Sequence, residues 1–159
     1  IHQNLALAEN LNASANLFLG REIYNKIYFR DEKKMFLESK KAINKINKYF
    51  KDFNTNVANL SGGQKQSIAI ARAVYFNAKV IIMDEPTAAL GPEETAIVRD
   101  IIKKLKENGI SIFLISHDIN DLFDLSDKIA VLKNGKLIDV KEKLNSNKDE
   151  ILEMIIKGK

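Results

Sequence analysis

Two adjacent carboxylates, Asp84 and Glu85, follow a short β-branched run and are the residues of this sequence best suited to chemistry. Carboxylates at the end of a buried strand are costly to desolvate unless a partner offsets their charge. A magnesium ion would do this, because Mg²⁺ binds through few carboxylates together with waters and substrate phosphates. Successive strand residues point to opposite faces, so one carboxylate can hold the ion while the other faces a water. The alternative is a pair of ordinary strand-end polar groups.

A second candidate site is the start of a helix, within "LSGGQKQSIAIARA" at residues 60–73. Ser61 is a natural N-cap, but Gly62 and Gly63 are poor helix formers and need a reason. Free N–H groups and the helix dipole make a helix N-terminus a site for anions, and glycines leave room for close approach. The sequence therefore indicates an anion site here. The structural alternative is a tight turn that serine caps before a buried helix.

Two further polar residues stand at expected strand ends. His117 follows "SIFLIS", and Gln3 follows an opening that has the pattern of the last residues of a strand. Ligands of open α/β sheets bind beyond the carboxyl ends of the strands, so we expect both residues near Asp84 and Glu85. A histidine there can contact phosphate or orient a water. Alternatively, His117 is an ordinary surface residue.

The sequence predicts two kinds of secondary structure around these residues. Residues from about 5 to 76 are predicted to be helical, because apolar side chains recur there at a helical period. Residues 79–84 and 111–116 are predicted to be short buried strands, with a helix at 92–108 between them. A strand–helix–strand unit implies that its two strands are parallel.

Local signals mark the ends of the later elements. Pro92 suits the first turn of its helix, and Gly109 suits a left-handed stop after it. The Asn134–Gly135 pair predicts a hairpin over residues 128–140. A final helix is expected within 148–159.

Composition sets the broad class. The chain has 159 residues, 45% of them hydrophobic, which suits one globular domain with a real core. No apolar run approaches the ~20 residues of a membrane span, and no signal-peptide pattern opens the chain. The absence of cysteine excludes disulfides and zinc–thiolate sites and fits a reducing cytosol. The net charge of +4 comes with scattered lysines and no aromatic-laced basic stripe, so no nucleic-acid partner is expected.

Together, the motifs resemble the ATP-binding cassette (ABC) ATPases. "LSGGQ" at 60–64 looks like the family's signature motif, and "VIIMDE" at 80–85 looks like the Walker B strand with its catalytic glutamate. His117 looks like the switch histidine and Gln3 like the glutamine of the Q-loop. Longer stretches, such as "ARAVYFNAKVIIMDEPTAALGPEET", resemble the ATP-binding subunits of bacterial importers for simple sugars of the ribose or fructose type.

The resemblance implies an α/β fold, with a P-loop NTPase (RecA-like) ABC ATPase core, an incomplete sheet and an inserted α-helical subdomain. It assigns about 5–76 to the helical subdomain with the signature motif, and 77–159 to part of the RecA-like core and a C-terminal helix. Gly91 stands at the end of the D-loop, where most of the family has aspartate. The chain has no G-x-x-x-x-G-K-[ST] phosphate loop. We therefore expect it to be the C-terminal two-thirds of one ABC ATPase domain, inactive alone.

In this family, two ATPase domains close head to tail over two ATP molecules, and the signature helix of one faces the γ-phosphate of ATP held by the other. The resemblance implies that Glu85 polarises the attacking water while Asp84 holds Mg²⁺ through its water shell. The assigned catalytic residues are Glu85, His117 and Gln3, the nucleotide-binding residues are Ser61, Gly62, Gly63 and Gln64, and the metal-binding residues are Asp84 and Gln3.

The resemblance also implies partners: a second ATPase subunit, a transmembrane permease and, indirectly, a solute-binding protein. The expected location is the cytoplasmic face of the bacterial cell membrane. An alternative is a non-catalytic remnant that donates its signature motif to an intact partner. Chromosome-maintenance and repair ATPases share these motifs but place long coiled coils between their halves, and the segment from Gln3 to Ser61 is too short for that.

Overall fold

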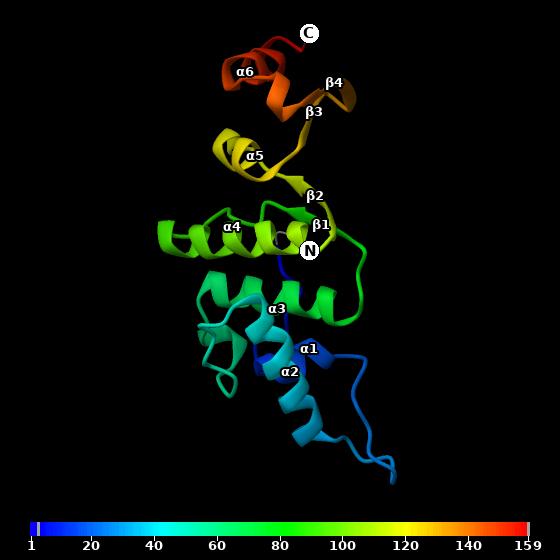
Figure 1. Ribbon diagram of the computed structural model, residues 1–159. Coiled ribbons are helices and arrows are strands. Elements are labelled where there is room, and N and C mark those ends of the chain that lie inside the picture. Colours follow the sequence, from blue (N-terminus) through cyan, green and yellow to red (C-terminus); the bar gives the residue numbers. More distant parts are fainter. Residues whose placement is uncertain (3, 159) are drawn as a thin grey trace. The chain divides into compact units, whose positions relative to one another are not determined.

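The computed structural model describes residues 1–2 and 4–158, which form two compact units (Figure 1). The first unit is Ile1–Phe113 and the second is Leu114–Lys159. The division falls inside a strand, between Phe113 and Leu114. The expected division at about residue 76 stays a prediction. No helix in the described part of the chain has the length and apolarity needed to span a membrane.

Three helices that pack on one another make up much of the first unit: α1 (Ala13–Phe18), α2 (Glu32–Ile46) and α3 (Gly62–Tyr75). Apolar side chains at a helical period turn toward the shared core. The residues that these helices bury almost completely include Leu17, Phe18, Ile43, Ile68 and Ile70. In the described chain, the predicted helical region therefore contains three α-helices and a short 3-10 helix, η1 (Val57–Asn59), with irregular segments between them.

The expectation of helix from residue 5 is wrong for residues 5–12, which follow an irregular path. The fully buried side chain of Asn16 fixes this path. Its Oδ1 accepts a hydrogen bond from the Ala8 N–H (2.7 Å), and its Nδ2 donates to the carbonyls of Ala8, Leu11 and Asn12. An asparagine that satisfies backbone groups in this way competes with helix formation.

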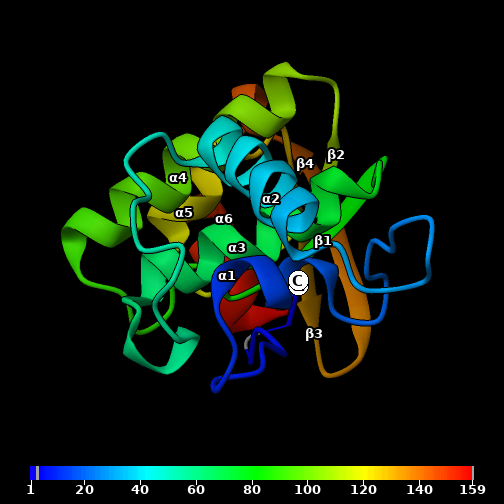
Figure 2. The ribbon, with the colours of Figure 1, turned by 90° about the horizontal axis from the view of Figure 1, so that it is seen from below.

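The segment between α1 and α2 extends away from the helices in both views (Figures 1 and 2). Asn25 Oδ1 holds its tip by accepting hydrogen bonds from the N–H groups of Ile27 and Phe29 (3.0 Å each). Tyr28, at the tip, has a φ of +59° and is 90% exposed. The next helix therefore begins only at Glu32, the first residue of α2, and Asp31 is its N-cap.

The strands β1 (Val80–Asp84) and β2 (Ser111–Ile115) form a two-stranded sheet. The starts of the two strands lie side by side, as expected for a parallel pair. The Ser111 N–H donates a hydrogen bond to the carbonyl of Lys79, which directly precedes β1 (3.1 Å). The expectation that both strands are buried is wrong. In β1, burial alternates along the strand, since only one of its faces is covered in the described chain: Ile81 and Met83 are buried, and Val80 and Ile82 are more than half exposed.

The helix α4 (Pro92–Glu107) joins these strands and packs against α3 (Figure 1). Pro92 lies in its first turn, and Gly109 follows its end with a φ of +77°, so the predicted boundaries are confirmed. Its apolar face is buried: Val98, Ile101, Ile102 and Leu105.

The described part of the second unit contains α5 (Ile119–Leu125), a hairpin of β3 (Lys128–Lys133) and β4 (Lys136–Glu142), a short 3-10 helix η2 (Lys143–Asn145), and α6 (Lys148–Lys157). The strands pair antiparallel across the predicted turn, where Asn134 and Gly135 both adopt positive φ angles. The hairpin and the final helix are thus confirmed. The short helix α5 was not predicted. Side chains of β3 and α6 form the core of this unit: Ile129, Val131, Ile151 and Met154.

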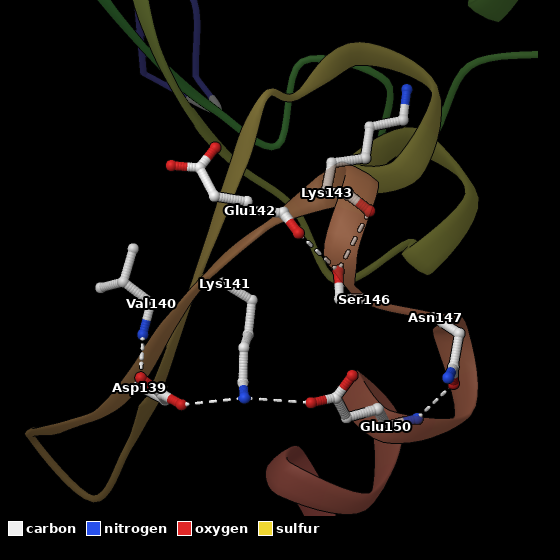
Figure 3. Close-up of polar contacts among 8 residues, drawn as sticks. All are labelled: Asp139, Val140, Lys141, Glu142, Lys143, Ser146, Asn147 and Glu150. Atoms are coloured by element: carbon white, nitrogen blue, oxygen red, sulfur yellow. Dashed lines mark hydrogen bonds and ion pairs between the residues drawn. The ribbon is translucent and has the colours of Figure 1, made fainter.

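An ion pair between Lys141 of β4 and Glu150 of α6 joins the hairpin to this helix (Figure 3). Lys141 Nζ lies 3.1 Å from Glu150 Oε1 and 3.4 Å from Asp139 Oδ2, and these hydrogen bonds raise the pKa of Lys141. Glu150 also belongs to the first turn of α6, where its N–H donates to the N-cap Asn147 (2.9 Å). The start of α6 is therefore fixed both by its cap and by β4.

Candidate functional site

The N-terminus of α3 is held by a capping box. Ser61 Oγ accepts a hydrogen bond from the Gln64 N–H (3.4 Å), and Gln64 Oε1 accepts one from the Ser61 N–H (2.9 Å). Gln64 Nε2 in turn donates to Asp52 Oδ2 (2.6 Å). This reciprocal bonding fixes the direction in which the first turn presents its N–H groups.

The two glycines of this turn pack against the segment that leads into α4. A Cβ atom on Gly62 would lie 2.4 Å from Leu90 Cδ2, and one on Gly63 would lie 3.3 Å from Glu94 Cβ. The space beside these glycines is therefore filled by the chain itself. The need for glycine at both positions has a structural cause besides the access for an anion that the sequence indicated.

The carboxylate of Glu94 lies at the N-terminus of α3. Its Oε1 accepts a hydrogen bond from the Gly63 N–H (3.5 Å), and its Oε2 accepts one from the Gly91 N–H (3.4 Å). A hydrogen bond with the side chain of Ser61 lowers the pKa of Glu94 most, and backbone N–H groups lower it further. The predicted anion site thus already contains one anion, which α4 supplies.

Buried side chains of α3 and of the end of α2 also hold the first turn of α3 in place. The buried Ser67 Oγ donates a hydrogen bond to the Gly63 carbonyl (2.8 Å) and accepts one from Asn47 Nδ2 (3.2 Å). Asn47 caps the end of α2. Two separate elements, the end of α2 and the start of α4, therefore determine where residues 61–64 lie.

Asp84 and Glu85 lie where the predicted site needs them, at the end of β1, and both are partly buried. Glu85 has a φ of +50°, which few non-glycine residues adopt and which is often found at functional sites. Glu85 therefore does not continue the strand. A tight turn begins there, since the Ala88 N–H donates to the Glu85 carbonyl (3.2 Å) and the Leu90 N–H to that of Thr87 (3.3 Å).

The chain start lies beside this strand end. The Asp84 N–H donates to the Ile1 carbonyl (3.0 Å), and the Ile1 amino group donates to the Ile82 carbonyl (2.6 Å). This is the backbone arrangement expected if the opening residues are a strand end. Gln3, the residue predicted to matter there, lies outside the described residues.

His117 belongs to the second unit, where it follows β2 and is exposed. Its predicted proximity to the carboxylates therefore stays a prediction. The structure brings together residues 61–64 with 90–94. Sequence reasoning missed the partners that make these contacts: Asn47, Ser67, Leu90 and Glu94. For Glu94, the only local signal was its place in the first turn of a helix, which does not reveal a partner 31 positions away.

The carboxylate of Asp84 at the end of β1 is an oxygen donor of the kind that Mg²⁺ binds. Among residues 1–2 and 4–158, no three or more His, Asp or Glu side chains gather into a group that could hold a metal. Mg²⁺ usually keeps several waters and needs only one or two carboxylates together with substrate phosphates. A single strand-end carboxylate such as Asp84 fits that requirement.

Comparison with known families decides the identity. A family model described as "ABC transporter" matches residues 1–88, which is more than half of the chain. The chain belongs to the ABC transporter family. The resemblance of the chain to the ABC ATPases is thereby confirmed, and the matched range includes "LSGGQ" and "VIIMD".

Two curated relatives are named as ATP-binding proteins for sugar import. The ABC chain is 46% identical over 155 residues to a xylose/arabinose import ATP-binding protein of Sulfolobus acidocaldarius, covering 98% of this chain and 61% of that protein. It is 38% identical over 158 residues to a ribose import ATP-binding protein of Caldanaerobacter subterraneus, covering 98% of this chain and 31% of that protein. The chain thus spans less than two thirds of the length of either relative.

Solved structures show the same fold. The chain superposes with a TM-score of 0.71 and 27% identity on a dimeric ATP-binding cassette in a post-hydrolysis state bound to ADP and Pi, covering 90% of this chain and 61% of that one. The predicted α/β fold, with a P-loop NTPase (RecA-like) core and an incomplete sheet, is confirmed. In the described ABC chain, the sheets have two strands each.

Proposed function

We propose that the ABC chain is part of an ATP-hydrolysing subunit that powers import of a simple sugar through a membrane permease. The observation that carries the proposal is the pair Asp84–Glu85, where a strand-end carboxylate is followed by a second carboxylate held at a positive φ. The names of the two sugar-importing relatives support the substrate class.

The proposed reaction is hydrolysis of ATP at the end of β1. Asp84 would hold Mg²⁺ through its water shell, and the ion supplies charge neutralisation on the phosphates. Glu85, which follows the strand at a positive φ, would accept a proton from the attacking water. Gln3 would sense the ion and the nucleophile, and His117 would steady the γ-phosphate.

The first turn of α3 would act on the nucleotide of a second subunit. Its N–H groups are presented by a capping box and anchored through Gly63, and they already attract a carboxylate. We infer that Ser61, Gly62, Gly63 and Gln64 contact the γ-phosphate of ATP bound by the partner in a head-to-tail dimer. The dimeric state of the similar solved cassette supports this arrangement.

The further partners follow from the proposed role in import. They are a transmembrane permease and, outside the membrane, a solute-binding protein that delivers the sugar. The subunit would lie at the cytoplasmic face of the cell membrane, attached to the permease.

The substitution Glu85→Gln tests the proposal, in a protein completed with the upstream segment that the longer relatives contain. Glutamine keeps the size of the side chain but cannot accept the proton, so hydrolysis should slow about 10²–10⁴-fold. Mg-ATP should still bind, and a closed ATP-bound dimer should accumulate in size-exclusion chromatography. Glu93→Gln, at an exposed position of α4, is the matched control and should hydrolyse normally. Hydrolysis by Glu85→Gln within a few-fold of the parent would refute the catalytic assignment.

A further inference from the structure

Glu94 stands where the proposed function places a phosphate. It reaches the start of α3 from the first turn of α4, with Oε1 on the Gly63 N–H and Oε2 on the Gly91 N–H. Ser61, the N-cap of α3, is also within its hydrogen-bonding reach. An anionic group from one helix thus occupies the N-terminus of another.

We propose that Glu94 is an internal occupant of the anion site at the start of α3, which the γ-phosphate of the partner's ATP displaces when the dimer closes. The inference rests on the proposed function, and it adds the regulation of that same site. It assigns Glu94 a role in setting the nucleotide concentration at which closure occurs.

Competition follows from the geometry. A backbone N–H makes one good hydrogen bond, so Gly63 cannot serve both Glu94 and a phosphate. The carboxylate also lies beside Gly62, because a Cβ on that residue would be 3.6 Å from Glu94 Oε2. An incoming phosphate therefore competes with the carboxylate for the Gly63 N–H.

The contacts also permit displacement. Both N···O distances, 3.5 and 3.4 Å, exceed the usual ~2.7–3.2 Å of such hydrogen bonds. The lowered pKa of Glu94 keeps the carboxylate ionised at neutral pH, so its charge offsets the positive end of the α3 dipole. Glu94 therefore both blocks the site and weakens its attraction for other anions.

Displacement of the Glu94 carboxylate would also affect Gly91 in the same subunit. The Glu94 carboxylate also accepts from Gly91, which ends the turn that begins at Glu85 and continues through Leu90. When the carboxylate leaves, it releases this N–H. Occupation of the α3 site by one nucleotide is thus linked to the backbone that follows the subunit's own Glu85.

A phosphate titration tests the competition without requiring hydrolysis. Inorganic phosphate is added at constant ionic strength while the amide resonances of Gly62 and Gly63 are followed by NMR. Glu94→Gln should bind phosphate about two- to fivefold more tightly than the parent, the range expected for one charge at a helix terminus. Glu93→Gln removes the same charge from the neighbouring exposed position and should leave the affinity unchanged.

A second variant guards against a folding defect. Glu94→Asp keeps the charge at the start of α4 but shortens the reach by one methylene, and it should also bind phosphate more tightly than the parent. Equal affinities in the parent and in both Glu94 variants would overturn the proposal, and so would an equal gain in Glu93→Gln.

Dimer closure separates this inference from the proposed function. In the completed protein carrying Glu85→Gln, adding Glu94→Gln should lower the ATP concentration at half-maximal dimerisation by the same factor. Unchanged or raised half-maximal ATP would refute displacement by nucleotide. Absence of ATP-driven dimers in every variant, with the phosphate result intact, would refute the proposed function and leave displacement by phosphate supported.

Discussion

Glu94 Oε1 lies 3.5 Å from the backbone nitrogen of Gly63, although 31 positions separate the two residues. This contact joins the start of α4 to the start of α3. It also explains the lowered pKa of Glu94, since the Ser61 side chain and the surrounding N–H groups stabilise its ionised form.

The lowered pKa of Glu94 makes this contact dependent on pH. In the unfolded chain the carboxyl has its ordinary pKa of 4.5, so its stabilising contribution is complete above that value and is lost as the pH falls through the lower, folded value. Urea denaturation at pH 7 and pH 3 should therefore show a larger loss of stability for the parent than for Glu94→Gln. Equal losses would mean that the contact is absent in solution.

Gly62→Ala should destabilise the protein because the new methyl group would meet Leu90 Cδ2. Overpacking costs about 1–3 kcal/mol, while alanine gains up to about 1 kcal/mol over glycine in a helix. We expect a net loss of about 1 kcal/mol. In a Leu90→Ala background, the same change should instead be neutral or stabilising. A double-mutant cycle by chemical denaturation measures this, and strictly additive effects would contradict the close packing.

Ser67→Ala should cost about 1–3 kcal/mol, because it leaves the buried Asn47 amide without its partner. It also removes the hydrogen bond to the Gly63 carbonyl. Thermal denaturation gives the size of the loss, and the α3 signals should shift in an NMR spectrum. Ser126→Ala, which removes a hydroxyl contact to Leu122 in the other unit, is a control that should leave the α3 signals in place.

Asp84→Asn should behave differently from Glu85→Gln in the completed protein. Loss of the strand-end carboxylate weakens the hold on the hydrated ion, so the Mg²⁺ concentration at half-maximal hydrolysis should rise about tenfold or more, given the several kcal/mol that such ions contribute. Glu85→Gln should lower the maximal rate without this shift. Titrating Mg²⁺ at saturating ATP separates the two, and the same Mg²⁺ dependence in both variants would contradict the assigned roles.

The elements that could be predicted from the sequence are those with local signals. Pro92 and Gly109 mark the ends of α4, and Asn134–Gly135 determines the hairpin turn. The expectation failed for residues 5–12, because the helical spacing of leucine and alanine there is overridden by the buried side chain of Asn16. Its hydrogen bonds depend on the folded path and leave no mark in the pattern.

The same distinction holds at the candidate site. The capping box of Ser61 and Gln64 could be predicted as a helix start, since both partners lie within four residues. The positive φ of Glu85 and the packing of Leu90 against Gly62 could not, because one depends on how β1 ends and the other on how α4 packs against α3. Tertiary contacts, rather than propensity, determine these features.

The close packing of Gly62 against Leu90 also constrains how this sequence can evolve. A larger residue at 62 is better tolerated after position 90 has become smaller, so the order of the two substitutions matters, and one path between the same end points passes through a less stable intermediate. The glycine would then persist in descendants for a reason that selection on nucleotide contact alone does not explain. Related sequences that carry alanine at position 62 should therefore carry a smaller side chain at position 90.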